Sequence, residues 1–100
     1  MNVIEYLKTE RAIEFFDTQP IKRAYLFGSY SRHEDTPESD IDILVDLDKS
    51  VNLFQFISMQ LTLEKLLNKK VDLLSSNGLS PHIKPYIDNE KILIYEKQHQ

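Results

Sequence analysis

The chain has 100 residues, a length that supports one ordinary hydrophobic core and predicts a single domain over residues 1–100. Its 16 acidic side chains outnumber 12 basic ones, which argues against an extended nucleic-acid-binding surface. It has no cysteine, which excludes disulfides, thiolate metal sites and cysteine catalysis, and it shows neither a signal peptide nor a long apolar span, so a soluble cytoplasmic protein is expected.

The first half of the chain predicts one helix and two strands. Residues 3–17 favour a helix, although Arg11 interrupts its apolar stripe. Pro20 ends this helix, and the apolar run Ile21–Phe27 is typical of a strand. A second strand is expected over Ile41–Leu47.

A longer helix follows, with Asn52 as its candidate N-cap and an end near Asn68. One face of this helix is polar and holds Gln55, Ser58, Thr62 and Lys65. The apolar remainder covers an arc wider than one contact with a sheet requires; it comprises Leu53, Phe56, Ile57, Leu63 and Leu67. Two interpretations remain open: part of this arc packs against a partner chain, or the whole arc is buried in the core.

The last third predicts two further strands, over residues 71–74 and 92–95, and a turn at Asn77-Gly78. Ser80-Pro81 favours the start of a short helix, because proline suits the first position after a serine cap. Pro85 is expected to shorten or kink this helix. The order of elements indicates an α+β fold.

The residues with the clearest chemistry lie around the first two strands. Gly28 closes the first strand, and Ser29 offers a hydroxyl and an N–H group to phosphate oxygens. Ten residues separate Ser29 from Asp40, and Asp40 and Asp42 project from the same strand face because side chains alternate. Two adjacent carboxylates repel each other unless a cation lies between them. A lone Asp-x-Asp is usually a solvated strand end, but together with the glycine-serine turn it indicates a site for Mg²⁺ and a nucleoside triphosphate.

Two residues near this motif are further candidates for nucleotide binding. The guanidinium of Arg32 suits phosphate, but Arg32 also has acidic neighbours with which it could simply pair, namely Glu34, Asp35 and Glu38. Ser39 either orients Asp40 or caps the turn that joins the two strands.

Asp72 interrupts the apolar run of the third predicted strand. A buried aspartate needs a partner, which could be Lys69, Lys70 or a metal ion. Because Asp40 and Asp42 are already placed as metal ligands, the metal is the favoured partner.

At this point the motifs resemble a known family. Residues 26–32 (LFGSYSR) and 39–45 (SDIDILV) resemble the signature of the DNA polymerase beta-like nucleotidyltransferases, and most of all the minimal nucleotidyltransferases (MNT) paired with HEPN proteins in prokaryotes. The similarity extends to residues 70–74 (KVDLL) and 79–81 (LSP). This resemblance implies a small mixed sheet flanked by helices, and it matches Asp72 to the third metal-binding carboxylate of the family.

The resemblance also implies a mechanism. Two Mg²⁺ ions would be held by Asp40, Asp42 and Asp72, with ATP as substrate, while Gly28 and Ser29 grip its outer phosphates. Asp72 would help to deprotonate the acceptor hydroxyl.

The three histidines carry weaker signals. His33 lies in the motif loop, where families of this kind commonly have a glycine, so its local turn could differ from theirs; it is either a catalytic group or simply solvated. His82 and His99 have no metal-ligating companion at a useful spacing.

By resemblance, the chain would be an antitoxin that adenylylates a tyrosine of a HEPN ribonuclease toxin. Two alternatives stay open. One is a binding module that has lost catalysis and neutralises the toxin by contact, and the other is a small-molecule nucleotidyltransferase completed by a second subunit. Three intact acidic residues favour the enzyme, since a binding module does not need such crowded charges.

Overall fold

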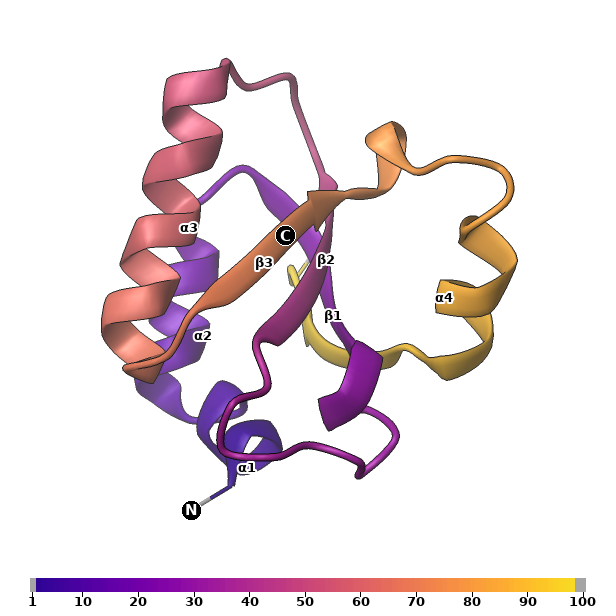
Figure 1. The fold of residues 1–100 in the computed structure, drawn as a ribbon. Coiled ribbons are helices and arrows are strands. Elements are labelled where there is room, and N and C mark those ends of the chain that lie inside the picture. Colours follow the sequence, from indigo (N-terminus) through magenta and orange to yellow (C-terminus); the bar gives the residue numbers. More distant parts are fainter. Residues whose placement is uncertain (1, 99–100) are drawn as a thin grey trace.

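The computed structural model describes residues 2–98, which form a four-stranded sheet with helices packed against it (Figure 1). The strands are β1 (Ile21–Phe27), β2 (Ile41–Leu47), β3 (Val71–Ser75) and β4 (Ile92–Glu96). Their order is β3-β2-β1-β4, with β2 and β3 parallel and the other neighbours antiparallel. The helices are α1 (Val3–Leu7), α2 (Glu10–Asp17), α3 (Leu53–Leu67) and α4 (Lys84–Glu90), with short 3₁₀ turns η1 (Gly28–Tyr30) and η2 (Ser76–Gly78). The predicted α+β class and mixed sheet are confirmed.

The hydrophobic core lies on one face of the sheet. Figure 1 shows α2 and α3 on one side of the strands and α4 on the other. Ile41, Ile43 and Val45 point into the core, as predicted from their alternation with the acidic residues of β2. They pack with residues from α1 to α3 and from the other strands, among them Leu7, Phe16, Leu26, Met59, Leu63, Val71 and Ile94. The opposite face of β2 carries the buried Leu44 and, at its start, Asp42 of the candidate site. In the part of the chain that is described, no helix is both long and apolar enough to cross a membrane.

The prediction of one helix over residues 3–17 is wrong, because the chain divides it into α1 and α2. Thr9 has an extended backbone (φ −73°, ψ 160°), and its hydroxyl donates to the Tyr6 carbonyl at 2.6 Å. This break changes the direction of the chain and allows both Leu7 and Phe16 to be fully buried, which explains the imperfect stripe in the sequence.

Helix α3 begins at the predicted cap. The Asn52 side chain accepts from the Gln55 N–H at 2.8 Å, and the Gln55 side chain accepts from the Asn52 N–H at 2.9 Å, which is a complete capping box. Only Met59 and Leu63 of this helix are buried. Four large apolar residues of α3 are exposed, at 69%, 83%, 43% and 52%: Leu53, Phe54, Ile57 and Leu61. The interpretation of α3 as a fully covered core helix is therefore wrong, and we call these four residues the α3 stripe.

Helix α4 starts later than Ser80-Pro81 predicts. The Ser80 hydroxyl oxygen accepts from the His82 N–H at 3.1 Å, so it closes a local turn, and the helix begins at Lys84. Pro85 has no N–H to donate to the preceding turn, so it fits within the first turn of a helix but not further along it. The turn at Asn77-Gly78 is present in η2, and the last two strands agree with the prediction to within one residue.

Candidate active site

The three aspartates singled out by the sequence come together beside the start of β2 and β3. Asp42 and Asp72 are direct neighbours in the parallel register, so their side chains leave the sheet on the same face. Asp40 lies one residue before β2, close enough for its charge to act on Asp42. The alternation that buries Ile41 and Ile43 presents Asp42, and Asp40 just before the strand, on the opposite face.

Negative charge is concentrated at Asp42. Partial burial, followed by the charge and hydrogen bond of Asp72 and the charge of Asp40, raises the pKa of Asp42 to about 6, although the positive charge of Arg32 acts in the opposite direction. A divalent cation beside Asp42 would relieve this repulsion, and carboxylate oxygens are the ligands that Mg²⁺ prefers.

The side chains do not enclose a metal position as they stand. Within residues 2–98, no three acidic or histidine side chains are arranged as a metal-binding group. Asp40 instead lies 3.8 Å from the Lys70 Nζ, and Lys69 donates to the Pro37 carbonyl at 2.7 Å. Neither lysine forms an ion pair with Asp72 among the described residues, so the proposed pairing of Asp72 with a lysine is not observed. The donor chemistry fits Mg²⁺, and the contact between Asp40 and Lys70 is a long one to an exposed lysine.

Gly28 brings the backbone against the aspartates. Its φ of +75° is a conformation that other residues rarely adopt, and a Cβ built at this position would overlap the Asp42 Oδ2. Glycine is thus required here both by conformation and by the closeness of Asp42. The Gly28 carbonyl accepts from the Ser31 N–H at 3.1 Å and the Ser31 hydroxyl at 2.8 Å, which fixes the turn η1.

Ser29 lies in η1, directly after this glycine, and is partly exposed. Its carbonyl accepts from the Glu34 N–H at 2.9 Å, whereas its hydroxyl has no hydrogen-bond partner among the residues described. The hydroxyl is therefore available to an incoming ligand, as its predicted role requires.

Arg32 is held by two carboxylates. Its Nε donates to the Glu34 Oε1 at 3.1 Å, which is one of the pairings considered from the sequence. Its Nη1 donates to the Glu90 Oε2 at 2.8 Å, and the Gly28 N–H donates to the Glu90 Oε1 at 3.0 Å. The hydrogen bond to Glu90 is the main cause that raises the pKa of Arg32. Sequence reasoning missed Glu90 because it lies 58 residues after Arg32, at the end of α4, with no motif around it.

Ser39 and His33 both lie in the loop between η1 and β2, and the structure shows a local role for each. The Ser39 hydroxyl oxygen accepts from the Thr36 N–H at 2.9 Å, so of its two predicted roles the structure shows the turn cap. His33 has a φ of 58°, the left-handed conformation that a glycine would favour, so its turn keeps the conformation expected of a glycine. His82 is exposed before α4, and His99 lies outside the described residues.

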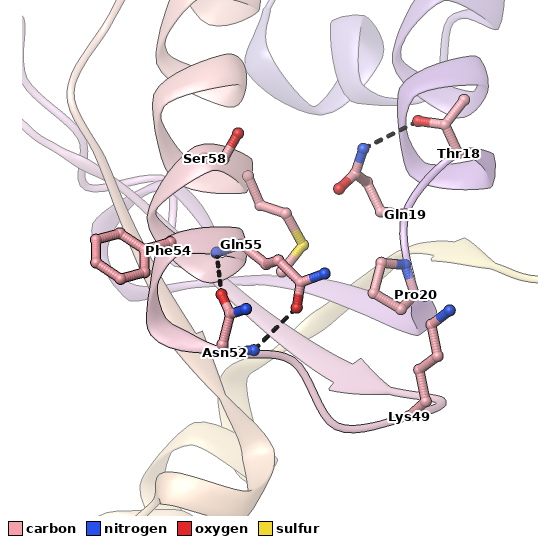
Figure 2. Close-up of a pocket in the computed structure, with 9 residues that line it drawn as sticks. Thr18, Gln19, Pro20, Lys49, Asn52, Phe54, Gln55 and Ser58 are labelled. Carbon is pink, nitrogen blue, oxygen red and sulfur yellow. Dashed lines mark hydrogen bonds between the residues drawn. The ribbon is translucent and has the colours of Figure 1, made fainter.

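A separate cavity of about 510 Å³ lies between the turn that precedes β1 and the N-terminal half of α3 (Figure 2). Its lining includes Gln19, Pro20, Lys49 and Gln55 and none of the candidate site residues. Phe54 projects away from Gln19 and Pro20 in this view. The lining contains none of the aspartates, so the candidate active site is the group of residues around Asp42 and η1.

Comparison with known proteins adds independent information. A family model described as polymerase beta nucleotidyltransferase matches residues 4–100. The protein adenylyltransferase MntA of Thermococcus cleftensis is 33% identical over 91 residues, which span 91% of this chain and 92% of that protein. A solved structure described as a candidate minimal nucleotidyltransferase is 31% identical, matches 89% of this chain and 93% of its own chain, and has a TM-score of 0.75.

Two further solved structures share the fold at lower identity. A toxin–antitoxin structure with AMP-PNP has a TM-score of 0.78 and 21% identity, over 97% of this chain and 76% of that chain. A complex of a tri-AMPylated HEPN toxin with an MNT antitoxin, from Shewanella oneidensis, has a TM-score of 0.61 and 23% identity, over 78% of this chain and 59% of that chain. From its sequence match and its fold, the chain belongs to the polymerase beta nucleotidyltransferase family and is a nucleotidyltransferase of the minimal type.

Proposed function

We propose that this chain transfers AMP from ATP to a hydroxyl group of a partner protein. The observation that carries this proposal is the crowding of Asp42 between Asp72, Asp40 and the Gly28 backbone. Such an arrangement costs stability unless a cation and a ligand use it, so it is best explained as a binding site for Mg²⁺ and a nucleotide. Residues 1–100 would act as one minimal nucleotidyltransferase domain, in the cytoplasm as expected from the sequence.

The residues of the site would divide the work. Asp40, Asp42 and Asp72 would hold two Mg²⁺ ions, which supply charge neutralisation at the transferring phosphoryl group and lower the pKa of the acceptor hydroxyl. The Ser29 hydroxyl, free in the structure, would donate to an outer phosphate, and the Gly28 turn lets the backbone approach closely.

Asp72 is the most exposed of the three acids and would take the proton of the acceptor hydroxyl. Arg32 would add a positive charge at the phosphates. Ser39 would act indirectly, by holding the loop that precedes Asp40.

A tyrosine of a HEPN-domain ribonuclease toxin is the acceptor we propose, with this chain as the antitoxin. The proposal is supported by a relative named as a protein adenylyltransferase and by a neighbouring fold that was solved with an AMPylated HEPN toxin. It also agrees with the net acidic composition, which does not favour a nucleic-acid acceptor.

A second candidate function is neutralisation of the toxin by contact alone. The α3 stripe favours it, because four large exposed apolar residues on one helix offer a surface for a partner whether or not the aspartates are active.

One experiment tests both functions. The partner encoded beside this gene is incubated with the purified chain, ATP and Mg²⁺, and its intact mass is measured. One or more added AMP units are expected with the wild type and with Glu38→Ala, an exposed acid of the same loop, and none with Asp40→Ala. A partner that is unmodified yet fully inhibited by the Asp40→Ala protein would establish contact inhibition instead.

A further inference from the structure

Glu90 connects α4 to the turn of the candidate site. It is the last residue of α4, and its side chain is 24% exposed. One carboxylate oxygen accepts from the Gly28 N–H at 3.0 Å, and the other accepts from the Arg32 Nη1 at 2.8 Å. A single carboxylate thus engages one main-chain donor and one guanidinium donor of the same turn.

This arrangement has a structural reason in the fold. The last pair of the ladder between β1 and β4 is Leu26 with Ile92, so the Gly28 N–H lies beyond the end of β4 and has no strand partner there. An N–H group without an acceptor costs free energy, and Glu90 supplies the acceptor. The same residue keeps Arg32 next to the turn.

The arrangement also has a consequence for anions. An N–H group and a guanidinium that converge on one carboxylate are the donors that bind a phosphate oxygen equally well. The Gly28 N–H carries one proton, so Glu90 and a phosphate cannot both receive it in a linear hydrogen bond. The negative charge of Glu90 would in addition repel a triphosphate at this position.

We propose that Glu90 is a positioning residue that acts as an internal counter-anion: it orders the Gly28 turn and Arg32 in the absence of nucleotide, and the triphosphate displaces it. The inference rests on the proposed binding of ATP at this turn. Displacement does not require α4 to move, because rotation about the side-chain torsions of Glu90 withdraws the carboxylate while Ile87 keeps α4 packed.

Affinity measurements by calorimetry test this inference. Mg-ATP and Mg-tripolyphosphate are titrated into the wild type, Glu90→Gln and Glu90→Ala. Loss of the carboxylate should lower the Kd of both ligands by roughly threefold to tenfold, because the competition for the Gly28 N–H weakens, and more for alanine, since glutamine still offers an acceptor to Gly28. If the Kd ratio of variant to wild type is the same for Mg-ATP and Mg-tripolyphosphate, Glu90 competes with the phosphates and not with the base.

Two control variants remove one negative charge each without touching the Gly28 N–H. The first is Asp88→Asn; Asp88 lies on the same helix and pairs with Lys84 and Lys91. The second is Glu34→Gln; Glu34 pairs with the same Arg32 as Glu90 does. Each should change the Kd by less than about twofold, because neither carboxylate competes for the main-chain donor.

A second measurement uses the wild type alone, so it does not depend on how the variants fold. In NMR spectra, Mg-ATP should shift the Gly28 amide proton and move the Glu90 carboxyl carbon towards the position of solvent-exposed glutamates. Tighter binding by the Glu90 variants together with these shifts supports the proposal. Unchanged or weaker binding by folded Glu90 variants, with a wild type that binds ATP, overturns this inference and leaves the proposed function intact. Absence of nucleotide binding in the wild type and in every variant overturns both.

Discussion

The turn of the candidate site and the exposed face of α3 are opposite kinds of surface. Around η1, charged and polar groups satisfy one another, as Glu90 does for Gly28 and Arg32. On α3, the stripe of Leu53, Phe54, Ile57 and Leu61 has no partner within the described chain. The polar groups of the turn are already hydrogen-bonded to one another, whereas the apolar side chains of the stripe are exposed. The site that we propose for the nucleotide is therefore built within this fold, whereas the described chain leaves the α3 stripe uncovered.

The largest effect on the turn is expected from Gly28→Ala. The methyl group of the alanine would overlap the Asp42 carboxylate, and the alanine backbone would have to adopt a φ of +75°. The free energy of unfolding should therefore fall by about 2–4 kcal/mol, and Mg-ATP binding should be lost. Urea unfolding and calorimetry check both results.

Gly78→Ala is the matched control for this substitution. A Cβ at Gly78 meets nothing within 4 Å, so its unfolding free energy should change by less than about 1 kcal/mol. If the Gly28→Ala protein is as stable as the Gly78→Ala protein, a Cβ at position 28 does not clash with the Asp42 side chain.

The second prediction concerns the stripe. Phe54 is 83% exposed, so Phe54→Ser should change the free energy of unfolding by less than about 0.5 kcal/mol while weakening the affinity for the partner by about 2 kcal/mol. Surface plasmon resonance with the co-purified partner and a thermal melt give the two numbers.

Leu63→Ala on the buried face of the same helix should behave in the reverse manner. It leaves a cavity in the core and should cost about 2–4 kcal/mol of stability, with affinity unchanged once the protein is folded. If Phe54→Ser melts far below the wild type and binds normally, the stripe serves the fold and not a partner.

The third prediction is that the site trades stability for function. The pKa of Asp42 is raised from 3.8 to about 6, so the folded protein holds this proton more tightly than the unfolded chain does. The stabilising contribution of the Asp42 carboxyl is therefore complete below about pH 4 and is lost as the pH rises through about 6. Asp42→Asn should raise the free energy of unfolding by about 1 kcal/mol near pH 7.5, a value reduced for solvent screening, and by almost nothing near pH 4.

Thermal melts without metal at the two pH values measure this difference, with the exposed loop variant Asp35→Asn as control. The Asp42→Asn protein should also lose Mg-ATP binding. A variant that is less stable than the wild type at both pH values would show that Asp42 contributes favourable contacts instead of unrelieved repulsion.

The features that could be predicted from sequence are those set by local pattern. Alternation in β2 separates Ile41 and Ile43 from Asp42, and the capping signal at Asn52 needs only the residues next to it. Asp72 is matched to the same site by resemblance to the family, and the parallel register of β2 and β3 places it beside Asp42.

The features that could not be predicted depend on tertiary packing. Glu90 reaches the turn only because the fold brings the end of α4 next to Gly28, and nothing in the local sequence specifies this path. Thr9 breaks a helix whose residues all permit helix, since the break buries Leu7 and Phe16 together. The width of an apolar arc, likewise, does not say which part of it the sheet covers.

The smallest effect on stability is expected at His33, which lies just after the turn η1. His33 holds a left-handed backbone with a φ of 58°, which costs a non-glycine residue about 1 kcal/mol, partly offset by the greater freedom of glycine in the unfolded chain. His33→Gly should therefore stabilise the protein by about 0.5 kcal/mol. Ser31→Gly, at a right-handed position with φ of −72°, should destabilise it by a similar amount or more, because Gly28 also loses a hydrogen bond from the serine hydroxyl. Parallel urea titrations compare the two variants. If both are destabilised, the imidazole of His33 contributes contacts that outweigh its backbone strain, and the histidine would then be part of how the turn is held.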